Sequence, residues 1–336
     1  MSTMPTIKRI DPADASAVRK LVDLTLAARA VDDPTSPPWS PRVIKLRMTL
    51  GLPVRGPGEL WSAPGDVPGG LAGGYWLQLP DTDNLSSAWL DLFVHPAARR
   101  RGLGTALLRH AMERTAANGR SLLAGPAIKG SAGEAFARRA EATVGLADVR
   151  RVLEVPRIPA GHIVRCRKNA AAAAAGYALT SWLGRTSDEH LKGVVAMELA
   201  LNDAPASPSV EPEAWDEQRV RDRKDGWIEA VGARGYHLAA ISDATGEMAA
   251  LTELAVYPDV PAWGFQGGTV VARPHRGHRL GMLVKAAMLE WLAEAEPQLE
   301  RIVTHNSASN SHMIAINEEL GFAVSGEHFL EVELSL

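Results

Sequence analysis

The sequence predicts a mixed α/β fold built as two tandem domains, and three observations support this prediction. The chain has 336 residues, a length that suits two ordinary domains better than one. Short apolar runs, typical of strands, alternate with amphipathic segments of helical period over its whole length. One strand–loop–helix unit occurs twice, at 90–116 and at 267–293, which indicates an internal repeat. We therefore expect domains at 1–184 and 185–336.

The first half begins with a strand and a helix. Asp14 or Ser16 can cap this helix, and its apolar stripe runs from Val18 to Leu26. The Gly/Pro-rich zone at 51–80 predicts short strands joined by turns, because glycine and proline interrupt regular structure. The other elements expected in this half are a helix at 37–51, a strand at 86–96, a helix at 101–118, a strand at 121–125, a helix at 133–142, a strand at 148–155, a helix at 158–176 and a strand at 177–184.

The second half approximately repeats this order. Ser187 can cap a helix that covers 187–205, and the Pro/Ser-rich stretch 202–213 predicts a loop within this half. Two strands on either side of the turn DATGE predict a hairpin. The expected elements are a helix at 213–235, the hairpin strands at 236–242 and 248–257, a strand at 263–272, a helix at 277–294, a strand at 301–306, a helix at 310–322 and a terminal strand pair within 323–336.

Composition excludes several classes of protein. The net charge is −3, with 22% charged and 46% hydrophobic residues, which is typical of a globular protein and argues against nucleic-acid binding. The single cysteine, Cys166, excludes an intrachain disulfide and a multi-cysteine metal site, and we predict no metal. It lies in a predicted helix rather than in a turn that exposes a nucleophile. No signal segment or membrane span is seen, so we expect a cytoplasmic protein that does not bind membranes.

The repeated unit contains a basic, glycine-containing loop, RRRGLG at 99–104 and RGHRLG at 276–281. Such a loop can be an ordinary solvated basic turn. It can also hold an anion, because the first turn of the following helix has backbone N–H groups without partners and a positive dipole end. Glycine lets the backbone approach a diphosphate closely, since no Cβ intervenes. The duplication in equivalent positions favours the anion site.

The loops resemble the acyl-CoA loop of the GNAT acetyltransferases, [QR]-x-x-G-x-[GA]. Neither loop has the third glycine of the dinucleotide fingerprint, and neither has the G-K-[ST] ending of the P-loop. Arg99, Gly102 and Gly104 match the GNAT pattern fully, whereas Arg279 replaces the middle glycine of the second copy. The order of strands and helices in each half also resembles that family. The resemblance therefore implies a tandem GNAT protein with acetyl-CoA, or another acyl-CoA, as its cosubstrate.

The resemblance also implies which residues hold acyl-CoA. In the family, the strand before the loop parts from its neighbour and pairs with the pantetheine arm, and the loop amides bind the diphosphate. The residues that match in the first half are Leu92, Phe93, Val94, Arg99, Arg100, Arg101, Gly102, Leu103, Gly104 and Thr105. Those in the second half are Val270, Val271, Arg276, Gly277, His278, Arg279, Leu280 and Gly281.

Candidate catalytic residues lie mainly in the second half. Glu253 can accept the proton of an acceptor amine, and Asn306 and Asn310 can line its site. Each also has an ordinary interpretation, as a solvent-facing edge residue or a helix cap. The first half offers mainly Asp91. The tyrosine that often protonates the leaving thiolate in the family is absent, since Asn317 stands at its position in the second half.

These observations predict an N-acyltransferase that acts on a small-molecule amine. The first half would hold acyl-CoA mainly as a structural ligand, and the second half would carry out the transfer. Tandem proteins of this kind occur in antibiotic and clavulanic-acid pathways, which the resemblance makes a possible setting. Two alternatives remain, a non-catalytic acyl-CoA-binding or regulatory protein and a protein-modifying acetyltransferase. The sequence predicts no particular oligomeric state.

Overall fold

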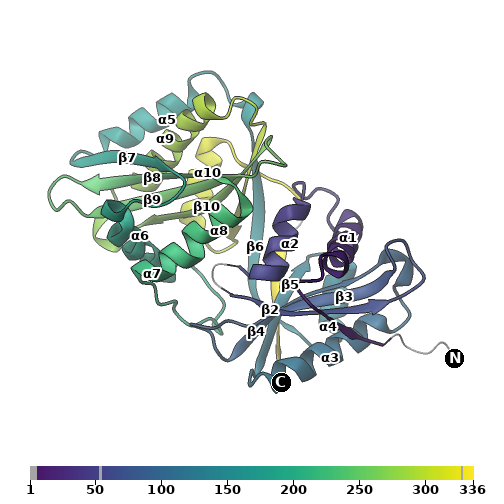
Figure 1. The fold of residues 1–336 in the computed structure, drawn as a ribbon. Helices are drawn as coiled ribbons and strands as arrows, with labels where there is room; N and C mark the ends of the chain where they lie inside the picture. Colours follow the sequence, from purple (N-terminus) through teal and green to yellow (C-terminus); the bar gives the residue numbers. More distant parts are fainter. Residues whose placement is uncertain (1–5, 53–54, 327) are drawn as a thin grey trace. The chain divides into compact units, whose positions relative to one another are not determined.

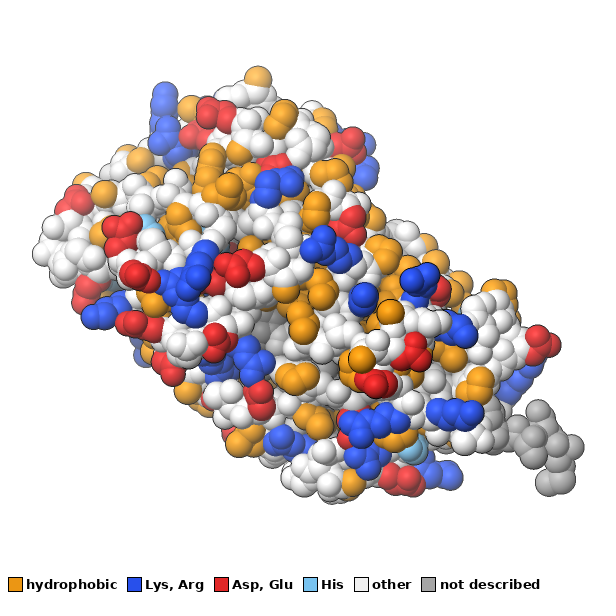
Figure 2. All heavy atoms as spheres, viewed as in Figure 1, with side chains coloured by type: hydrophobic (Ala, Val, Ile, Leu, Met, Phe, Trp, Pro, Cys, Tyr) orange, Lys and Arg blue, Asp and Glu red, His pale blue; other side chains and the backbone are white. Residues whose placement is uncertain are grey.

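The chain folds into two compact units, which we describe separately (Figure 1). The computed structural model describes residues 6–52, 55–326 and 328–336. The first five residues, part of the segment inspected for a signal peptide, lie outside this range. No helix in the described ranges is both long and apolar enough to cross a membrane. Basic and acidic side chains lie intermixed on the face shown in Figure 2, in keeping with the small net charge.

The first unit comprises residues 1–148, 207–211 and 326–336. Its strands pair antiparallel except for β4 and β5, which run parallel. The last strand of the chain, β13, lies between β5 and the beginning of β6. The strand order is β1 (Lys8–Ile10), β2 (Gly58–Pro64), β3 (Leu71–Gln78), β4 (Ser87–Val94), β5 (Leu122–Ile128), β13 (Phe329–Ser335) and β6 (Thr143–Glu154).

Helices cover both faces of the first unit's sheet. Asp14 and Ser40 cap α1 and α2, respectively, and these helices bury an apolar core that includes Leu21, Ile44 and Trp76. The opposite face packs a second core, which includes Leu107 of α3. The helix bounds are α1 (Ala15–Asp32), α2 (Pro41–Leu50), α3 (Leu103–Ala117) and α4 (Ala132–Arg139), all close to the predicted ranges.

The second unit comprises residues 149–206 and 212–325. It repeats the arrangement of the first, with β10 and β11 as its parallel pair. The end of β6 completes the sheet next to β11, and the short strand β12 pairs with β6. The other strands follow in the order β11 (Arg301–Ser307), β10 (Trp263–Val271), β9 (Met248–Val256), β8 (Arg234–Ser242) and β7 (Tyr177–Leu183), with β12 at Ala323–Val324.

One predicted helix of the second unit is interrupted. The range 213–235 contains two short α-helical pieces joined by a π-helix at Val220–Asp225. Within this π-helix, Lys224 donates to Glu253 and Glu198, and Asp225 accepts from the amide of Thr186. The helices are α5 (His162–Ala172), α6 (Asp188–Ala200), α7 (Glu217–Arg219), α8 (Gly226–Val231), α9 (Leu280–Ala295) and α10 (Ser311–Leu320).

The two units differ from the division predicted at 184/185. Helix α5 packs on α9, and β7 pairs with β8 along its whole length, so residues 149–184 belong to the second unit. The sequence predicts that the two terminal strands pair with each other, but in the described residues they do not. Instead β13 pairs with β5 and β6 in the first unit, while β12 stays in the second. Both differences from the prediction, in the division of the chain and in the partners of the terminal strands, arise because the sequence pattern alone does not specify which strands pair.

Candidate functional site

The two basic loops follow the same backbone path. The first passes through left-handed conformations at Arg100 (φ 63°) and Gly102 (φ 83°). The second does so 177 positions later (277 − 100 and 279 − 102), at Gly277 (φ 88°) and Arg279 (φ 54°). Each loop thus has glycine at one left-handed position and arginine at the other, in opposite order. The backbone confirms the internal repeat that the sequence predicts.

An arginine braces each loop in the same way. Arg99 donates from Nε to the carbonyl at the end of β4 (3.1 Å) and from both Nη atoms to Asp32 (2.7 Å each). Arg276 donates from Nε to the carbonyl at the end of β10 (3.2 Å) and from Nη2 to Asp203 (2.9 Å). These side chains hold the first loop against the end of α1 and the second loop against the short turn that follows α6. A bound diphosphate would therefore be held chiefly by backbone amides.

The helices that follow the loops begin in a manner that suits an anion. Among the described residues, no side chain caps α3, which starts after Gly102, or α9, which starts after Arg279. By contrast, Ser131 caps α4 and Asn310 caps α10 through their side-chain oxygens. The uncapped first-turn amides of α3 and α9 are donors that a diphosphate can accept from. The residues present thus fit the diphosphate of coenzyme A.

The sheet parts next to each loop. In the first unit, β4 pairs with β5 at 87–89, but β4 continues to Val94, beside the loop. In the second unit, β10 pairs with β11 at 263–265 and continues to Val271. The pairing of β10 with β9 has a bulge between Gln266 and Thr269. This bulge lies just after the point where β10 stops pairing with β11. The edges of β4 and β10 that no longer pair with β5 and β11 contain the segments predicted to pair with the pantetheine arm.

A cavity of about 110 Å³ lies beside the parted strands of the first unit. Residues of β4, β5, β13, α3 and α4 line it, and the lining is apolar, with Leu92, Leu108 and Ala137 among its members. Phe136 connects this cavity to the loop helix, because a Cβ added at Gly104 would lie 3.5 Å from its ring. Ala137 stands at the position of the family's tyrosine, so this wall offers no phenol.

In the second unit, Glu253 lies in a largely buried charged cluster. A Cβ added at Gly268 in the β10 bulge would lie 4.0 Å from Glu253 Oε2, which places this carboxylate beside the opening of the sheet. Lys224 Nζ donates to Glu253 Oε2 (2.8 Å) and also to Glu198, and His237 Nδ1 lies 3.1 Å from Glu253 Oε1. Burial raises the pKa of Glu253, but Lys224 and His237 outweigh burial and lower it to about 2.

This low pKa changes the role that Glu253 can play. A carboxylate that holds its proton so weakly is a poor base, but it is well suited to orient His237. If Nδ1 of His237 carries the proton that faces Glu253, Nε2 is a free acceptor. Nε2 is buried and has no hydrogen-bond partner among the described residues. Neither His237 nor Lys224 was predicted from the sequence; a histidine inside the apolar run YHLAAIS was the available signal.

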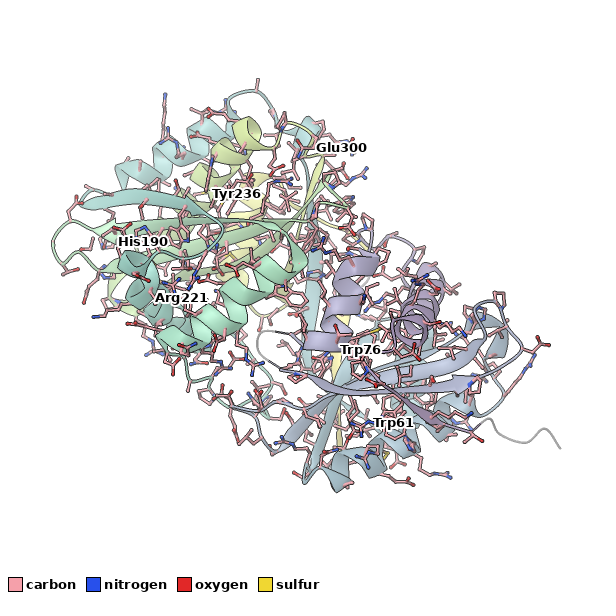
Figure 3. The ribbon with its side chains drawn as sticks, viewed as in Figure 1. Trp61, Trp76, His190, Arg221, Tyr236 and Glu300 are labelled. Atoms are coloured by element: carbon pink, nitrogen blue, oxygen red, sulfur yellow. The ribbon has the colours of Figure 1, made fainter. Side chains whose placement is uncertain are left out.

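Trp182 extends the same row of side chains. Trp182, His237 and Glu253 are directly opposite one another on β7, β8 and β9. The rings of Trp182 and His237 stack with centroids 5.0 Å apart and planes 1° apart. Figure 3 labels His190 and Arg221 on the helical layer of the same unit, and the His190 ring lies 4.5 Å from Trp182. The stacked indole thus fixes the plane of the His237 ring.

The asparagines predicted to line the site form local bonds. Asn310 Oδ1 accepts from the amide of Met313 (3.2 Å) and caps α10. Asn306 Oδ1 accepts from Nδ2 of the buried Asn317 (2.6 Å). Neither bond reaches the Glu253 cluster. Capping accounts for Asn310, and catalytic roles for Asn306 and Asn310 stay predictions.

The first unit also has a buried acid beside its open strands. Asp91 on β4 is 2% exposed, and Trp89 Nε1 donates to its Oδ2 (3.1 Å). Burial raises the pKa of Asp91, and the nearby Arg47 and Arg29 oppose this rise without cancelling it. The first half is therefore better equipped with polar groups than its sequence suggested.

Cys166 is buried between α5 and α10. Its Sγ lies 3.7 Å from His162 Nε2 and 3.8 Å from the carbonyl oxygen of Glu319. Burial raises the pKa of the thiol, so the thiolate that a nucleophile requires is disfavoured.

Comparison with known proteins identifies the domain type. The family described as "Acetyltransferase (GNAT) domain" matches residues 58–139 of this chain. The mycothiol acetyltransferase of Salinispora arenicola is 27% identical over 333 residues, which cover 97% of each chain. The mycothiol acetyltransferase of Mycobacterium avium is 26% identical over 269 residues, covering 77% of this chain and 78% of that protein.

Solved structures extend the similarity to the whole fold. The tandem GNAT protein from the clavulanic acid biosynthesis pathway superposes with a TM-score of 0.78 at 28% identity, covering 98% of both chains. A GCN5-related N-acetyltransferase from Sphaerobacter thermophilus gives a TM-score of 0.67 at 14% identity, covering 99% of this chain and 97% of that one. The second likeness shows the fold alone.

Proposed function

We propose that this chain, which carries a GNAT acetyltransferase domain and has the fold of a tandem GNAT protein, is an N-acetyltransferase that acylates a small-molecule amine with acyl-CoA. The observation that supports transfer most directly is the His237–Glu253 pair beside the bulge and the opening of β10. The relatives named for mycothiol support a small-molecule acceptor. The neighbour from the clavulanic acid pathway supports a setting in secondary metabolism, such as antibiotic biosynthesis.

We assign the transfer to the second unit. The amine nitrogen attacks the thioester carbonyl, the new C–N bond forms, and the C–S bond breaks to release the thiolate of coenzyme A. His237 Nε2 accepts the proton of the amine, while Glu253 orients the imidazole and stabilises it once it is charged. Lys224 keeps Glu253 ionised for this role. The thiolate can leave without a tyrosine, because a thiol has an ordinary pKa of about 8.5.

The first unit holds acyl-CoA mainly as a structural or regulatory ligand in this proposal. Its loop matches the family pattern fully, and the cavity next to its open strands is apolar. No counterpart of the His237–Glu253 pair occurs there at the equivalent positions, Leu60 and Trp76 (237 − 177 and 253 − 177). A tightly held thioester without a base beside it would be stored rather than consumed.

Matched substitutions in the two loops test this division. Gly104→Glu and Gly281→Glu each place a carboxylate where the diphosphate would bind, and native mass spectrometry counts the acyl-CoA that remains. We expect each variant to lose one equivalent and Gly281→Glu alone to lose turnover. Gly104→Ala is the control, because its methyl group meets Phe136 and Val94 at ordinary distances of 3.5 and 3.6 Å. Loss of turnover in Gly104→Glu alone would reverse the assignment.

A non-catalytic acyl-CoA-binding protein is the second candidate function, and the missing tyrosine favours it. A thiol-release assay with a panel of amines separates the two. Release of free coenzyme A that depends on the amine supports transfer. Tight binding of acetyl-CoA without release by any amine in the panel supports the binding protein.

A further inference from the structure

One lysine of the second unit is buried without a counter-charge. Lys285 lies on α9 and is 2% exposed. In the part of the chain that the structure describes, no carboxylate pairs with its Nζ and no oxygen accepts a hydrogen bond from it. Its Nζ lies 5.2 Å from the centre of the Phe322 ring. A buried ammonium with three donors and no acceptor is costly, so a lysine in this setting gives up its proton readily.

Burial leaves the amine of Lys285 largely uncharged. It lowers the pKa of Lys285 to about 7, and no neighbouring charge opposes this shift. Burial alone would lower the pKa of Lys224 as well, but Glu253 and Glu198 outweigh burial and raise it. A large share of Lys285 therefore carries no proton near neutral pH, whereas an exposed lysine is almost wholly protonated. A neutral amine has the free electron pair that a nucleophile needs.

Lys285 lies on the face of α9 that borders the opening of the sheet. It comes four residues after Gly281 of the loop, so both positions share one face of the helix, about 6 Å apart along its axis. A Cβ added at Gly281 would lie 3.1 Å from Ile316 of α10 and 3.7 Å from Val271 at the end of β10. That end of β10 no longer pairs with β11. This face of α9 therefore leads from the loop, past the parted strands, to Lys285.

The first unit shows what surrounds the position of this lysine. The equivalent residue is Leu108 (285 − 177), which lines the cavity beside the parted strands. Leu92 of β4 lines the same cavity, and it belongs to the segment that we predict to pair with the pantetheine arm. In the first unit, one space thus connects the position of the lysine with the predicted path of the thioester.

Phe322 comes from the wall of the corresponding space in the second unit. The helices α4 and α10 match with a spacing of 180, because Phe136 and Ile316 (316 − 136) are the residues next to the equivalent loop glycines. By this spacing Phe322 corresponds to Ala142, which lines the cavity of the first unit. The contact between Lys285 and the Phe322 ring therefore places the amine in that corresponding space.

We propose that Lys285 is a site of self-acylation, at which the amine takes the acyl group of acyl-CoA bound to the second unit. This inference rests on the proposed binding of acyl-CoA, but it needs no acceptor amine. Nζ attacks the thioester carbonyl, the new C–N bond forms, and the C–S bond breaks. The proton lost by the nitrogen neutralises the thiolate of coenzyme A, and the side chain becomes an amide. Because the amide is uncharged, the cost of burying an ammonium disappears.

Incubation of the full-length protein with isotopically labelled acetyl-CoA, without any amine, tests the site. Intact-mass spectrometry should show the gain of one acetyl group, and peptide mapping should place it at Lys285. This reaction should be about tenfold or more faster than acetylation of Lys192, an exposed lysine on α6 that stays protonated. Desulfo-coenzyme A, which has no sulfur to carry an acyl group, should suppress the labelling of Lys285 but not that of Lys192.

Matched substitutions complete the test. Lys285→Met should lose the rapid gain of an acetyl group, and the control Lys192→Met should keep it. If Lys285 gains no label, or gains it no faster than Lys192, the buried amine does not accept the acyl group. If desulfo-coenzyme A leaves the labelling of Lys285 unchanged, the acyl group does not come from the proposed site. Failure of the proposed function would be seen separately, as the absence of amine-dependent release of coenzyme A.

Discussion

The two units share a scaffold but place their buried acid on different strands. At equivalent positions, the first unit has Trp76 on β3 and Asp91 on β4, whereas the second has Glu253 on β9 and Gly268 on β10 (253 − 76 and 268 − 91 are both 177). In the first unit the acid is on β4, the strand that precedes the loop. In the second unit it is on β9, the neighbour of the strand that precedes the loop. In both units it stays next to the place where the sheet parts.

The surroundings of the two acids differ more than their positions. Glu253 has a lysine and a histidine as partners within the protein, and the lysine also pairs with Glu198. Asp91 has one indole donor, and the arginines near it keep unpartnered N–H groups. The comparison teaches that a duplicated fold can keep its basic loop while one copy pairs its acid with charged side chains and the other keeps buried N–H groups without a partner among the described residues.

The largest expected effect comes from removing the imidazole that distinguishes the second unit. His237→Gln should lower kcat by about a hundredfold or more, because general base catalysis contributes on this scale. A stopped assay of thiol release at saturating substrate measures the change. The control is His110→Gln in the first unit, where His110 Nδ1 bonds to the hydroxyl of Tyr75 (2.7 Å). Equal loss in both variants would remove the functional distinction between the units.

The next largest effect concerns the lysine that compensates the acids of the second unit. Lys224→Met should destabilise this unit by about 3 kcal/mol, because it leaves the carboxylates of Glu198 and Glu253 buried without their cation. Urea unfolding followed by tryptophan fluorescence measures the loss. The loss should shrink as the pH falls toward 4, since protonation then removes the uncompensated charge. A loss independent of pH would contradict this explanation.

For another lysine of the second unit, Lys285, we expect replacement by methionine to raise the stability rather than lower it. Lys285 on α9 is 2% exposed, and burial lowers its pKa to about 7. Its equivalent in the first unit is Leu108 (285 − 177), which lines the apolar cavity. Lys285→Met should therefore stabilise the second unit by about 2 kcal/mol near neutral pH, after allowance for the lost contact with the Phe322 ring.

The pH dependence of this gain follows from the direction of the shift. The folded protein releases the lysine proton above pH 7, whereas the unfolded chain keeps it until about pH 10.4. The penalty in the wild type is therefore full below pH 7 and disappears as the pH approaches 10.4. The advantage of Lys285→Met in urea unfolding should shrink over the same range. An advantage that is constant from pH 6 to 10 would show that packing, not charge, is responsible.

The smallest expected effect tests the exchanged glycines of the loops. Gly102→Arg makes the first loop resemble the second and should cost about 1 kcal/mol of stability, because a side chain at φ 83° is strained. Arg279→Gly makes the reverse change and should alter stability by less, since relief of strain is offset by the lost pair with Glu319. Differential scanning calorimetry measures both. A cost above about 3 kcal/mol for Gly102→Arg would mean that the loops are not equivalent.

Much of the fold could be predicted from the sequence, because helices and strands follow local periodicity. The segment at 101–118 and the strand at 86–96 match α3 and β4 closely. The π-helix at Val220–Asp225 could not be predicted, since it depends on buried partners that other elements supply. The placement of β13 in the first unit depends on long-range pairing, for which the sequence has no periodic signal.

The candidate site also could be predicted only where its residues are close together in the sequence. The loops could be predicted because their residues are contiguous. Glu253 was also predicted, but its pairing with Lys224, and hence its low pKa, depends on contacts between residues 29 positions apart. His237 lies on the strand paired with that of Glu253. The buried N–H groups of Arg29, Arg47 and Trp76 come from α1, α2 and β3. Such groupings exist only after the chain has folded.

The last strand of the chain has a consequence for how the protein is made. β13 fills the gap between β5 and β6, so the sheet of the first unit lacks an interior strand until residues 329–335 have left the ribosome. The first unit, most of which is synthesised early, must therefore wait for residues 329–335 before its sheet is complete. Until then the edges of β5 and β6 to which β13 pairs stand open, and such edges are prone to pair with other chains.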